Sequence, residues 1–313
     1  MDKLFLFDAY ALIYRSYYAF MKNPRINSKG LNTSCVMGFC NTLNEILTKE
    51  KPTHIGVAFD HGKTFRHEAF PAYKAQREET PEDIKLSVPI IKNILEAYHI
   101  PILQVDGFEA DDIIGTVATQ AGKKGIETYM LTPDKDYGQL VRENVYMYRP
   151  QHGGGYEKLG VEEIEQKYGI SSPLQVIDLL ALMGDSADNF PGCPGVGEKT
   201  AVKLINEFGS VEELIANSAK VKGKLREKVE AATEDIKMSK FLATIRTDVP
   251  VTQNLDDLKV VEPDKEKLDE IFTELEFKSF ATRILKKPQK VQTKPTGELD
   301  FCLLYTSPSP RDT

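Results

Sequence analysis

The chain has 313 residues, a length that suits one large domain or two joined ones. Its 41% hydrophobic and 28% charged residues are typical of a globular protein. Its four cysteines form no C-x-x-C pair and have no histidine at zinc spacing, which argues against a structural zinc site or a disulfide framework and favours a cytoplasmic location. No run of roughly 18 apolar residues predicts a membrane span, and the net charge of −7 by itself argues against a nucleic-acid partner.

Short apolar runs alternate with longer amphipathic runs along the first half of the chain. The short runs predict strands at residues 4–7, 54–59, 100–105, 127–131 and 144–148, and the longer runs predict helices at residues 36–49, 83–98 and 113–123. This alternation predicts an α/β fold around a mostly parallel sheet. Residues 61–81 interrupt it, because they are charged and aromatic without a clear period, and excursions of that length are usually functional or mobile.

The pattern changes after residue 160, where strands give way to helices. We expect residues 1–160 to form the sheet domain and residues 161–285 to form a helical domain packed against it. Residues 286–301 have the composition of a linker, rich in Pro, Lys, Gln and Thr. Residues 302–313, CLLYTSPSPRDT, look like the translation of a sequencing adapter, and the alternative is a native Ser/Pro linker.

Acidic residues follow one predicted strand after another. The stretch GFEADDIIGT, which follows the third strand, contains three carboxylates within four positions. The acids that follow the strands are Asp8, Asp60, Glu109, Asp111, Asp112, Asp134 and Asp136, and a turn after an apolar helix adds Asp185 and Asp188. Helix capping explains any one of these acids, but it does not predict that strand after strand should end in one.

The carboxyl ends of parallel strands lie along one edge of a sheet, so we expect these nine carboxylates to meet there. Like charges brought together repel, which predicts raised pKa values or a bound cation. An all-oxygen ligand set favours Mg²⁺ or Mn²⁺, and two such ions roughly 4 Å apart can clamp a phosphodiester. Setting the nine acids aside leaves 38 acidic against 40 basic residues, so the net charge does not exclude a DNA partner.

The excursion that begins beside Asp60 is basic and aromatic. Its sequence DHGKTFRHEAFPAYKAQR contains Lys63, Arg66, Tyr73, Lys74 and Arg77. Cations interleaved with aromatic rings suit single-stranded nucleic acid, since phosphates pair with charge and bases stack on rings. A solvated surface loop is the alternative. Lys74 and Arg77 would share one face if the segment became helical.

Two further stretches carry candidate contacts. In GCPGVGEKTAVKLI, Gly195 and Gly197 precede a predicted helix that has Lys199 in its first turn. Backbone N–H groups at such a turn can hold a phosphate without reading base sequence, although a plain helix start is the commoner origin of this pattern. In DAYALIYRSYYAF, Arg15 lies among tyrosines, most of which we expect to pack in the core.

Five ordered stretches together resemble the flap endonuclease family, and in particular the 5′-nuclease domain of bacterial DNA polymerase I. They are FDAYALIYRSYYAF, FDHGKTFRHEAFPAYKAQR, GFEADDIIGT, TPDKD and ALMGDSADNFPGCPGVGEKTA. The resemblance covers about residues 1–285 and implies a PIN-like sheet domain, a helical arch at about residues 61–81 and a helix–three-turn–helix module in the helical domain. Pro133, where related chains often have Gly, and Cys193 in the glycine turn are departures that touch no carboxylate.

The resemblance also implies roles for single residues. One metal ion would be bound by Asp8, Asp60, Glu109, Asp111 and Asp112, and the second would lie among Asp134, Asp136, Asp185 and Asp188. The catalytic residues would be Lys74 and Arg77, which meet the scissile phosphate, with Asp8 and Asp60. The contacts to DNA would be Arg15, Lys63, Arg66, Tyr73, Gly195, Gly197 and Lys199, with a K⁺ ion at the glycine turn.

The expected activity is that of a 5′–3′ exonuclease and 5′-flap endonuclease that needs two Mg²⁺ ions, which Mn²⁺ can replace. Its expected partners are DNA with a 5′ flap or nick and RNA-primer–DNA junctions, for a monomeric, nucleoid-associated enzyme without membrane contact. We interpret the chain as the N-terminal fragment of a longer DNA polymerase of that type. The alternatives are a standalone flap endonuclease, a PIN-type ribonuclease and a non-catalytic junction-binding module.

Overall fold

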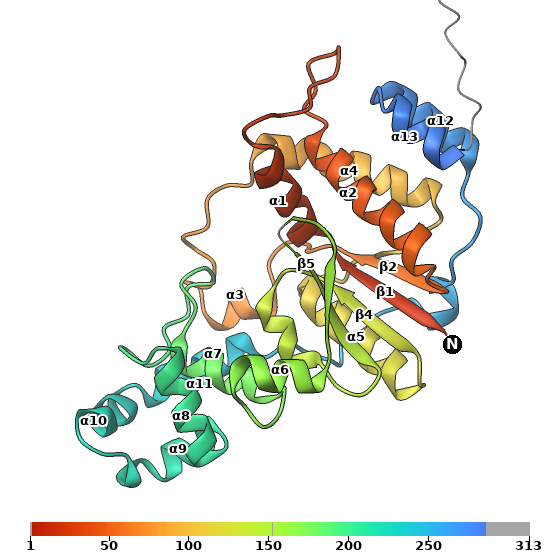
Figure 1. Ribbon diagram of the computed structural model, residues 1–313. Coiled ribbons are helices and arrows are strands. Elements are labelled where there is room, and N and C mark those ends of the chain that lie inside the picture. The colour runs from red at the N-terminus through yellow and green to blue at the C-terminus, as the bar shows by residue number, and fades with distance from the viewer. Residues whose placement is uncertain (1, 152, 286–313) are drawn as a thin grey trace, which may run out of the picture.

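A six-stranded sheet lies at the centre of the computed structural model, which describes residues 2–151 and 153–285 (Figure 1). The strand order is β3-β2-β1-β4-β5-β6. The strands are β1 (Lys3–Asp8), β2 (His54–Ala58), β3 (Ile102–Leu103), β4 (Glu127–Leu131), β5 (Val145–Pro150) and β6 (Tyr156–Leu159). The first five pair in parallel and β6 runs antiparallel to β5, which confirms the mostly parallel α/β fold.

Both faces of the sheet are covered, which explains why its central strand reads as a continuous apolar run. In β1, Phe5 and Phe7 point into one core and Leu4 and Leu6 into the other, and all four are fully buried. The helices on the phenylalanine face are α1 (Ala9–Phe20), α2 (Ser34–Glu45) and α4 (Glu82–Ala97), and the opposite face is covered by α5 (Ala110–Lys123). Helix α2 continues into a π-helical turn, η1 (Ile46–Glu50).

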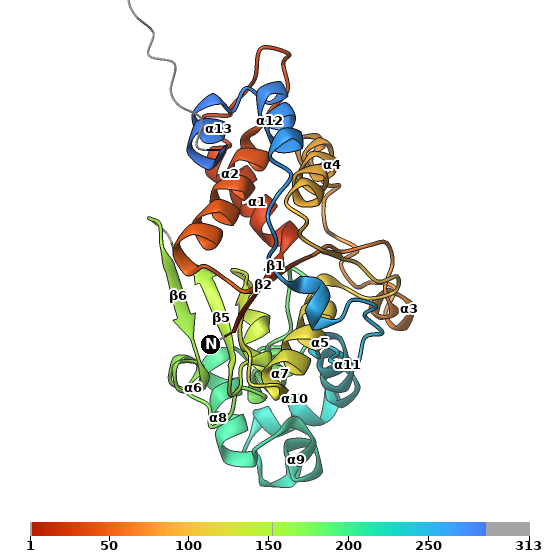
Figure 2. The same cartoon turned by 90° about the vertical axis from the view of Figure 1, so that its right-hand side faces the viewer.

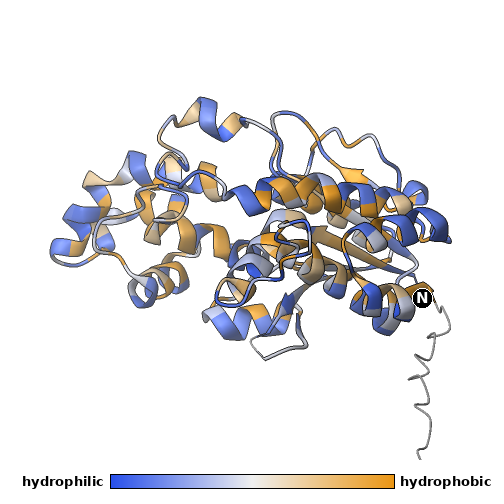
Figure 3. Ribbon diagram, turned by 90° about the horizontal axis from the view of Figure 1, so that it is seen from above, coloured by the Kyte–Doolittle hydropathy of each residue, from blue (hydrophilic) through white to orange (hydrophobic). Residues whose placement is uncertain are grey.

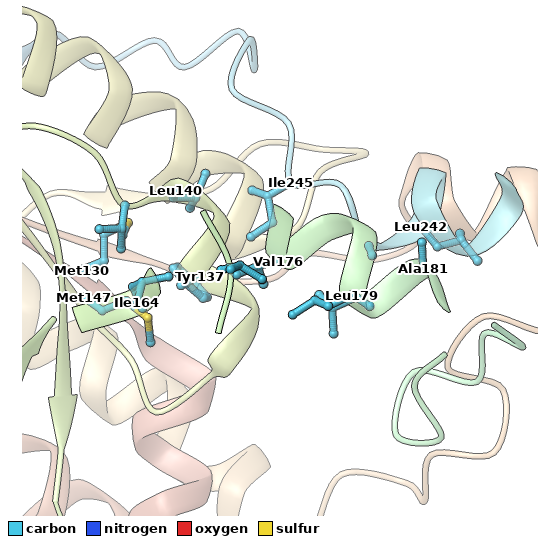
Figure 4. Packing of buried hydrophobic residues seen from close by; sticks show 14 of the residues in the cluster. Met130, Tyr137, Leu140, Met147, Ile164, Val176, Leu179, Ala181, Leu242 and Ile245 are labelled. Carbon is cyan, nitrogen blue, oxygen red and sulfur yellow. The ribbon is translucent and has the colours of Figure 1, made fainter. Parts of the chain in front are cut away.

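A helical part follows the sheet in the sequence and extends from one end of the molecule (Figure 2). Its helices are α6 (Val161–Tyr168), α7 (Gln175–Met183), α8 (Glu198–Phe208), α9 (Val211–Ala216), α10 (Lys224–Ala231) and α11 (Thr233–Ala243), with the short turn η3 (Ser218–Lys220). Its core is continuous with that of the sheet. Figure 4 shows Met130 and Met147 from the strands in the same cluster as Val176 of α7 and Leu242 of α11.

The chain returns to the sheet after α11, which corrects the expected extent of the helical domain to residue 285. The returning elements are η4 (Leu255–Leu258), α12 (Lys265–Glu274) and α13 (Lys278–Leu285). The backbone N–H of Val260 donates to the carbonyl of Thr53, and that of Asp264 donates to the carbonyl of Ala97. Phe272 of α12 is fully buried in the core on the phenylalanine face. Figure 2 shows α12 and α13 at the end of the molecule opposite α9.

All five predicted strands are present, whereas β6 and α1 were not predicted. The hydropathy view shows apolar residues along the central strands and hydrophilic residues on the outer faces of the peripheral helices (Figure 3). In the part of the chain that the structure describes, no helix combines the length and apolarity needed to cross a membrane. The predicted linker at 286–301 and the predicted adapter-derived tail at 302–313 lie outside the described residues.

Candidate metal centre

The strand ends deliver carboxylates to one edge of the sheet. Asp8 is the last residue of β1 and caps α1, where its side chain accepts a hydrogen bond of 3.1 Å from the backbone N–H of Ala11. Asp60 follows β2 and accepts a 2.7 Å bond from the N–H of Ala110, the first residue of α5. Asp134 follows β4 and caps the turn η2 (Lys135–Leu140). Each acid thus sits where a parallel strand ends or a helix begins.

The carboxylates at this edge raise one another's pKa values. Burial raises the pKa of Asp8 to about 7, and the negative charges of Asp60 and Asp134 add to the shift. Burial and the charge of Asp188 raise the pKa of Asp134. Burial, followed by the charge of Asp134, holds the pKa of Asp136 well above its ordinary value. These mutual shifts indicate a shared, poorly solvated region in which the charged forms are disfavoured.

The region also contains an acceptor without a donor. Among the described residues, Oδ1 of Asp136 is a buried side-chain oxygen that has no hydrogen-bond partner. A buried carboxylate oxygen without a donor lowers the stability of the fold, because its hydrogen bonds to water are lost and no hydrogen bond within the protein replaces them. A cation beside Asp136 would satisfy it.

Cationic side chains engage four of the nine acids. Nζ of Lys74 lies 2.9 Å from Oε2 of Glu109 and 3.9 Å from Oδ2 of Asp188. Arg77 also pairs with Asp188, and Nζ of Lys135 lies 3.1 Å from Oδ2 of Asp185. The fourth, Asp112, pairs with Arg66. The remaining five acids are Asp8, Asp60, Asp111, Asp134 and Asp136, and of these only Asp111 has an ion-pair contact within the described chain, at 3.9 Å from Arg66.

The chemistry of the donors fits divalent cations. Within residues 2–151 and 153–285, no group of three or more His, Cys, Asp or Glu side chains is arranged tightly enough to hold a metal ion as it stands. The five acids without a close cation nevertheless all have raised pKa values, with burial as the largest cause in each. An oxygen-only donor set of this kind suits Mg²⁺ or Mn²⁺.

The predicted arch is a short helix followed by turns. Helix α3 (Phe65–Ala69) begins at a capping box formed by Thr64 and His67. Beyond it, Lys74 has a left-handed φ of 56°, so the segment is not the continuous helix in which Lys74 and Arg77 would share a face. Both cations nevertheless reach Asp188, because the backbone N–H of Lys74 donates to the carbonyl of Asp188 and holds the turn against that loop.

Two residues that we expected to contact DNA are buried instead. The side chain of Arg66 is 1% exposed, and Tyr73 is 3% exposed. The hydroxyl of Tyr73 donates to Glu109 at 3.0 Å and to Asp188 at 3.3 Å. A side chain covered to this degree cannot reach a phosphate without unfolding its surroundings, so the DNA-contact prediction for both is wrong in this conformation. Arg15 and Lys63 are exposed, as a DNA contact requires.

The glycine turn has the geometry that its sequence predicts. Gly195 adopts a φ of 76°, Gly197 is the N-cap of α8, and Lys199 is exposed in the first turn of that helix. Sequence reasoning missed Lys228 of α10. A Cβ added at Gly195 would lie 2.6 Å from Nζ of Lys228, so this ammonium packs directly against the turn. Only the density of lysines around residues 220–228 could have suggested it.

The loop that carries Asp185 and Asp188 is closed by a backbone contact that only glycine allows. Gly192 has a φ of 62°, and a Cβ there would lie 2.2 Å from the backbone N of Gly184. We expect Gly192→Ala to lower the free energy of unfolding by about 3 kcal/mol or more, because backbone must move on both sides. Gly209→Ala is the matched control, since its φ is 86° but nothing lies within 4 Å, and it should cost about 1 kcal/mol. Urea unfolding of both variants measures the difference, and equal losses would contradict this packing.

The raised pKa of Asp8 predicts that metal-free protein is more stable in mild acid. The folded-state pKa is about 7, above the ordinary value of 3.8, so the folded state binds more protons between these values. Stability from this group is therefore lost as the pH rises toward 7. We expect the melting temperature in EDTA to be higher at pH 5.5 than at pH 8 by roughly 5 °C. Asp8→Asn should reduce this difference without abolishing it, because Asp60, Asp111, Asp134 and Asp136 also have raised pKa values. A melting temperature that rises with pH in both proteins would contradict the shift.

The sequence matches two family models that together span most of the chain. Residues 3–169 match the model described as the N-terminal resolvase-like domain of 5′-3′ exonucleases, and residues 171–266 match the model of their C-terminal SAM fold. Among solved structures, the chain is similar to a bacteriophage T5 flap endonuclease in complex with DNA and metal ions. The TM-score is 0.66 at 19% sequence identity, over 91% of this chain and 98% of that one. This likeness shows that the fold is shared.

The chain matches some related proteins over only part of their length and another over nearly all of its length. DNA polymerase I of Bacillus caldotenax is 42% identical over 305 residues, which are 96% of this chain but 34% of that protein. The chain thus spans about a third of the length of the DNA polymerases that it matches. A protein named 5′-3′ exonuclease from Aquifex aeolicus is 37% identical over 292 residues, covering 93% of this chain and 96% of that protein. With the family models matched over residues 3–169 and 171–266, this chain belongs to the 5′-3′ exonuclease family.

Proposed function

We propose that this chain is a divalent-metal-dependent 5′–3′ exonuclease and structure-specific 5′-flap endonuclease, which hydrolyses phosphodiesters near single-strand/duplex junctions. The observation that carries the proposal is the cluster of acids with raised pKa values at the carboxyl edge of the sheet, directly beside Lys74. Structural ion pairing explains only some of these acids, whereas a site for cations and phosphate explains the whole arrangement.

The residues divide into two groups around the proposed ions. Asp8, Asp60, Glu109 and Asp111 would hold one Mg²⁺, and Asp134, Asp136, Asp185 and Asp188 would hold the other, some of them through water. When bound, the ions would lower the pKa of an attacking water and neutralise the charge on the phosphodiester. The protein's own part is to fix the acids on strand ends and helix starts, and to exclude bulk water by burying Asp8. Asp112 differs from these acids, because its carboxylate is paired with Arg66.

Lys74 and Arg77 supply the positive charge on the other side of the phosphate. Nζ of Lys74 lies among carboxylates, with its side chain only 18% exposed, while Arg77 is 52% exposed. A phosphate that enters beside Glu109 would compete for both cations, and their charge would stabilise the negative charge that builds up in the transition state. Lys74 is the better placed of the two, because it is already held at the carboxylate edge.

The exposed cations describe a path for DNA. The turn at Gly195 and Gly197, with Lys199, would bind the phosphate backbone of a duplex, and we propose K⁺ as an ion at that turn. Arg15 and Lys63 would contact the strand that enters the site. The similarity to a solved flap endonuclease bound to DNA supports this assignment. The substrates would be DNA with a 5′ flap or nick and the RNA-primer–DNA junctions of replication and repair, acted on by a monomer in the cytoplasm at the nucleoid.

We also propose that the chain represents the N-terminal nuclease part of a DNA polymerase I. The support is that it matches about a third of several proteins of that name at similar identity, 42% for those of Bacillus caldotenax and Bacillus subtilis. A standalone flap endonuclease is the second candidate, since the Aquifex aeolicus protein named 5′-3′ exonuclease is matched over 96% of its length.

Cleavage of a labelled 5′-flap duplex with MgCl₂ and with EDTA tests the proposal, with an RNA hairpin of the same length as the comparison substrate. We expect cutting near the junction that requires MgCl₂ or MnCl₂ and a much slower reaction on the hairpin. Faster cutting of the RNA hairpin would favour a PIN-type ribonuclease. Tight flap binding without cleavage at any metal concentration would leave only a junction-binding module.

A further inference from the structure

Among the described residues, the most buried cation is Arg66, which lies directly beside the metal centre, with its Nη1 3.4 Å from Glu109 and 3.9 Å from Asp111. The side chain of Arg66 is 1% exposed and that of Asp112 is 0% exposed, and the two form a bidentate pair with distances of 2.7 and 2.8 Å. An arginine stays charged even when it is buried to this degree, so its donors must be satisfied inside the protein for the fold to be stable. Burial lowers the pKa of Arg66, but the charges of Asp111 and Asp112 more than reverse this and leave its pKa above the ordinary value.

All three nitrogens of the Arg66 guanidinium are in use. Nε donates to the carbonyl of Leu242 at 2.8 Å, and Nη2 donates to the carbonyl of Thr244 at 2.9 Å as well as to Oδ1 of Asp112. Nη1 donates to Oδ2 of Asp112 at 2.7 Å and to Oε2 of Glu109 at 3.4 Å. No donor of Arg66 is left to bind a phosphate.

The carboxylate of Asp112 is equally saturated. Its Oδ1 accepts from Arg66 and from the backbone N–H of Arg246 at 2.8 Å. Its Oδ2 accepts from Arg66 and from the backbone N–H of Glu109 at 3.1 Å, which closes the capping box at the start of α5. A carboxylate oxygen has about two lone-pair directions, so both oxygens are fully used. A metal ion could bind Asp112 only by breaking bonds in a region closed to solvent.

The pair ties three distant parts of the chain to one point. Arg66 comes from α3 at the base of the arch, Asp112 from the first turn of α5, and the two carbonyls from the end of α11 and the residue after it. The same first turn carries Glu109 and Asp111. The N–H of Glu109 is held by the carboxylate of Asp112, and the carboxylate of Asp111 is held by the N–H of Asp112. These bonds therefore fix the direction in which the side chains of Glu109 and Asp111 point.

We propose that Asp112 is not a metal ligand but forms a buried positioning pair with Arg66. The pair orients Glu109 and Asp111 of the metal centre. It also holds the arch and the helical part against the metal centre. This proposal rests on the proposed function, because the pair is proposed to orient residues of a metal centre. It assigns opposite roles to two neighbouring acids, with Asp111 facing the ions and Asp112 facing Arg66.

A double-mutant cycle on the full chain tests this assignment. The variants are Arg66→Met, Asp112→Asn and the two together, with Asp111→Asn as the matched control one residue away. The first readout is the melting temperature in EDTA. We expect Arg66→Met to lower it by roughly 8 °C or more, because Asp112 is left as a buried charge without a partner. Adding Asp112→Asn should recover part of that loss, while Asp111→Asn alone should leave the melting temperature unchanged or raise it.

The second readout is the dissociation constant for Mn²⁺, measured by calorimetric titration with MnCl₂ well below the melting temperature. Arg66→Met and Asp112→Asn should each weaken binding by about threefold to tenfold through the misplaced first turn of α5. In the Arg66→Met background, Asp112→Asn should change the constant by less than about twofold. Asp111→Asn should weaken binding by more than about tenfold in both backgrounds. Arg66→Lys replaces Arg66→Met in the cycle if the latter does not fold.

The outcomes separate the possible roles. If Asp112→Asn weakens Mn²⁺ binding by the same large factor in the parent and in Arg66→Met, and the melting temperature is unchanged, Asp112 is a ligand. That result would overturn the proposal. Unchanged Mn²⁺ binding in every Arg66 and Asp112 variant would overturn the positioning role. If the parent chain binds no Mn²⁺ at all, the proposed function fails, while the melting-temperature cycle still decides whether Arg66 and Asp112 act as a pair.

Discussion

Replacing Asp134 by alanine is expected to lower the rate of flap cleavage by at least about a thousandfold while the protein remains folded. Asp134 caps η2 directly after β4 and raises the pKa values of both Asp8 and Asp136, so its charge is felt on both sides of the proposed site. Its loss would weaken the binding of both proposed ions, and transition-state stabilisation of several kcal/mol depends on them. Single-turnover cleavage at saturating MgCl₂ and excess enzyme measures the effect.

The melting temperature of Asp134→Ala shows whether a loss of cleavage comes from the metal centre or from unfolding. Burial and Asp188 raise the pKa of Asp134, so removing the charged side chain relieves a cost in the metal-free fold, whereas losing its cap on η2 costs about 1 kcal/mol. Because the two effects oppose each other, we expect the melting temperature in EDTA to stay within about 4 °C of the parent value. Asp2→Ala, an exposed acid just before β1, is the control for loss of one negative charge and should cleave at the parent rate. A variant at Asp134 that cleaves within tenfold of the parent would contradict a role for this acid in the metal centre.

Lys74→Ala is expected to reduce the single-turnover rate by about a hundredfold to a thousandfold, with a smaller effect on substrate affinity. The ammonium lies 2.9 Å from Glu109 inside the carboxylate edge, where a preorganised charge acts in a poorly solvated region. Arg77→Ala should cost less, about tenfold, because the guanidinium is half exposed and water can take its place. Rates measured as a function of flap concentration distinguish a loss in kcat from a loss in binding.

Lys63→Ala provides the matched comparison for Lys74. Lys63 is an exposed cation on the same excursion, and among the described residues it has no ion pair. Its removal should raise KM, increasingly at low salt, and leave kcat nearly unchanged. Similar losses of kcat in the variants at Lys63 and Lys74 would show that the arch acts only through its overall charge.

The sheet and the acids at its edge could be predicted from the sequence for one physical reason. A parallel strand buried on both faces is a continuous apolar run, and it must end where the chain becomes polar again, so LFLFD and IGVAFD mark both the strand and the position of the acid. Strand β6 could not be predicted in this way. It is an edge strand of four residues, YEKL, half of them charged, and it is specified by pairing with β5 rather than by its own pattern.

Tertiary contacts account for what the sequence did not reveal. The sequence predicts residues 265–285 only as part of the helical domain at 161–285, and only the structure shows Phe272 packed with the core of α2 and α4. Arg66 looks like a DNA contact because it stands in a basic, aromatic stretch. Its partner Asp112 lies 46 positions away, and the carbonyl of Leu242 lies 176 positions away. No local pattern distinguishes a cation buried by such contacts from an exposed one.

Counting bound Mn²⁺ shows directly whether the acids at the carboxyl edge of the sheet bind divalent ions. Electron paramagnetic resonance of free Mn²⁺ in a titration gives the number of ions bound per chain without any reaction taking place. We expect two Mn²⁺ ions per chain for the parent protein and at least one fewer for Asp134→Ala. The same number of ions bound by both proteins, or none bound at millimolar MnCl₂, would contradict it.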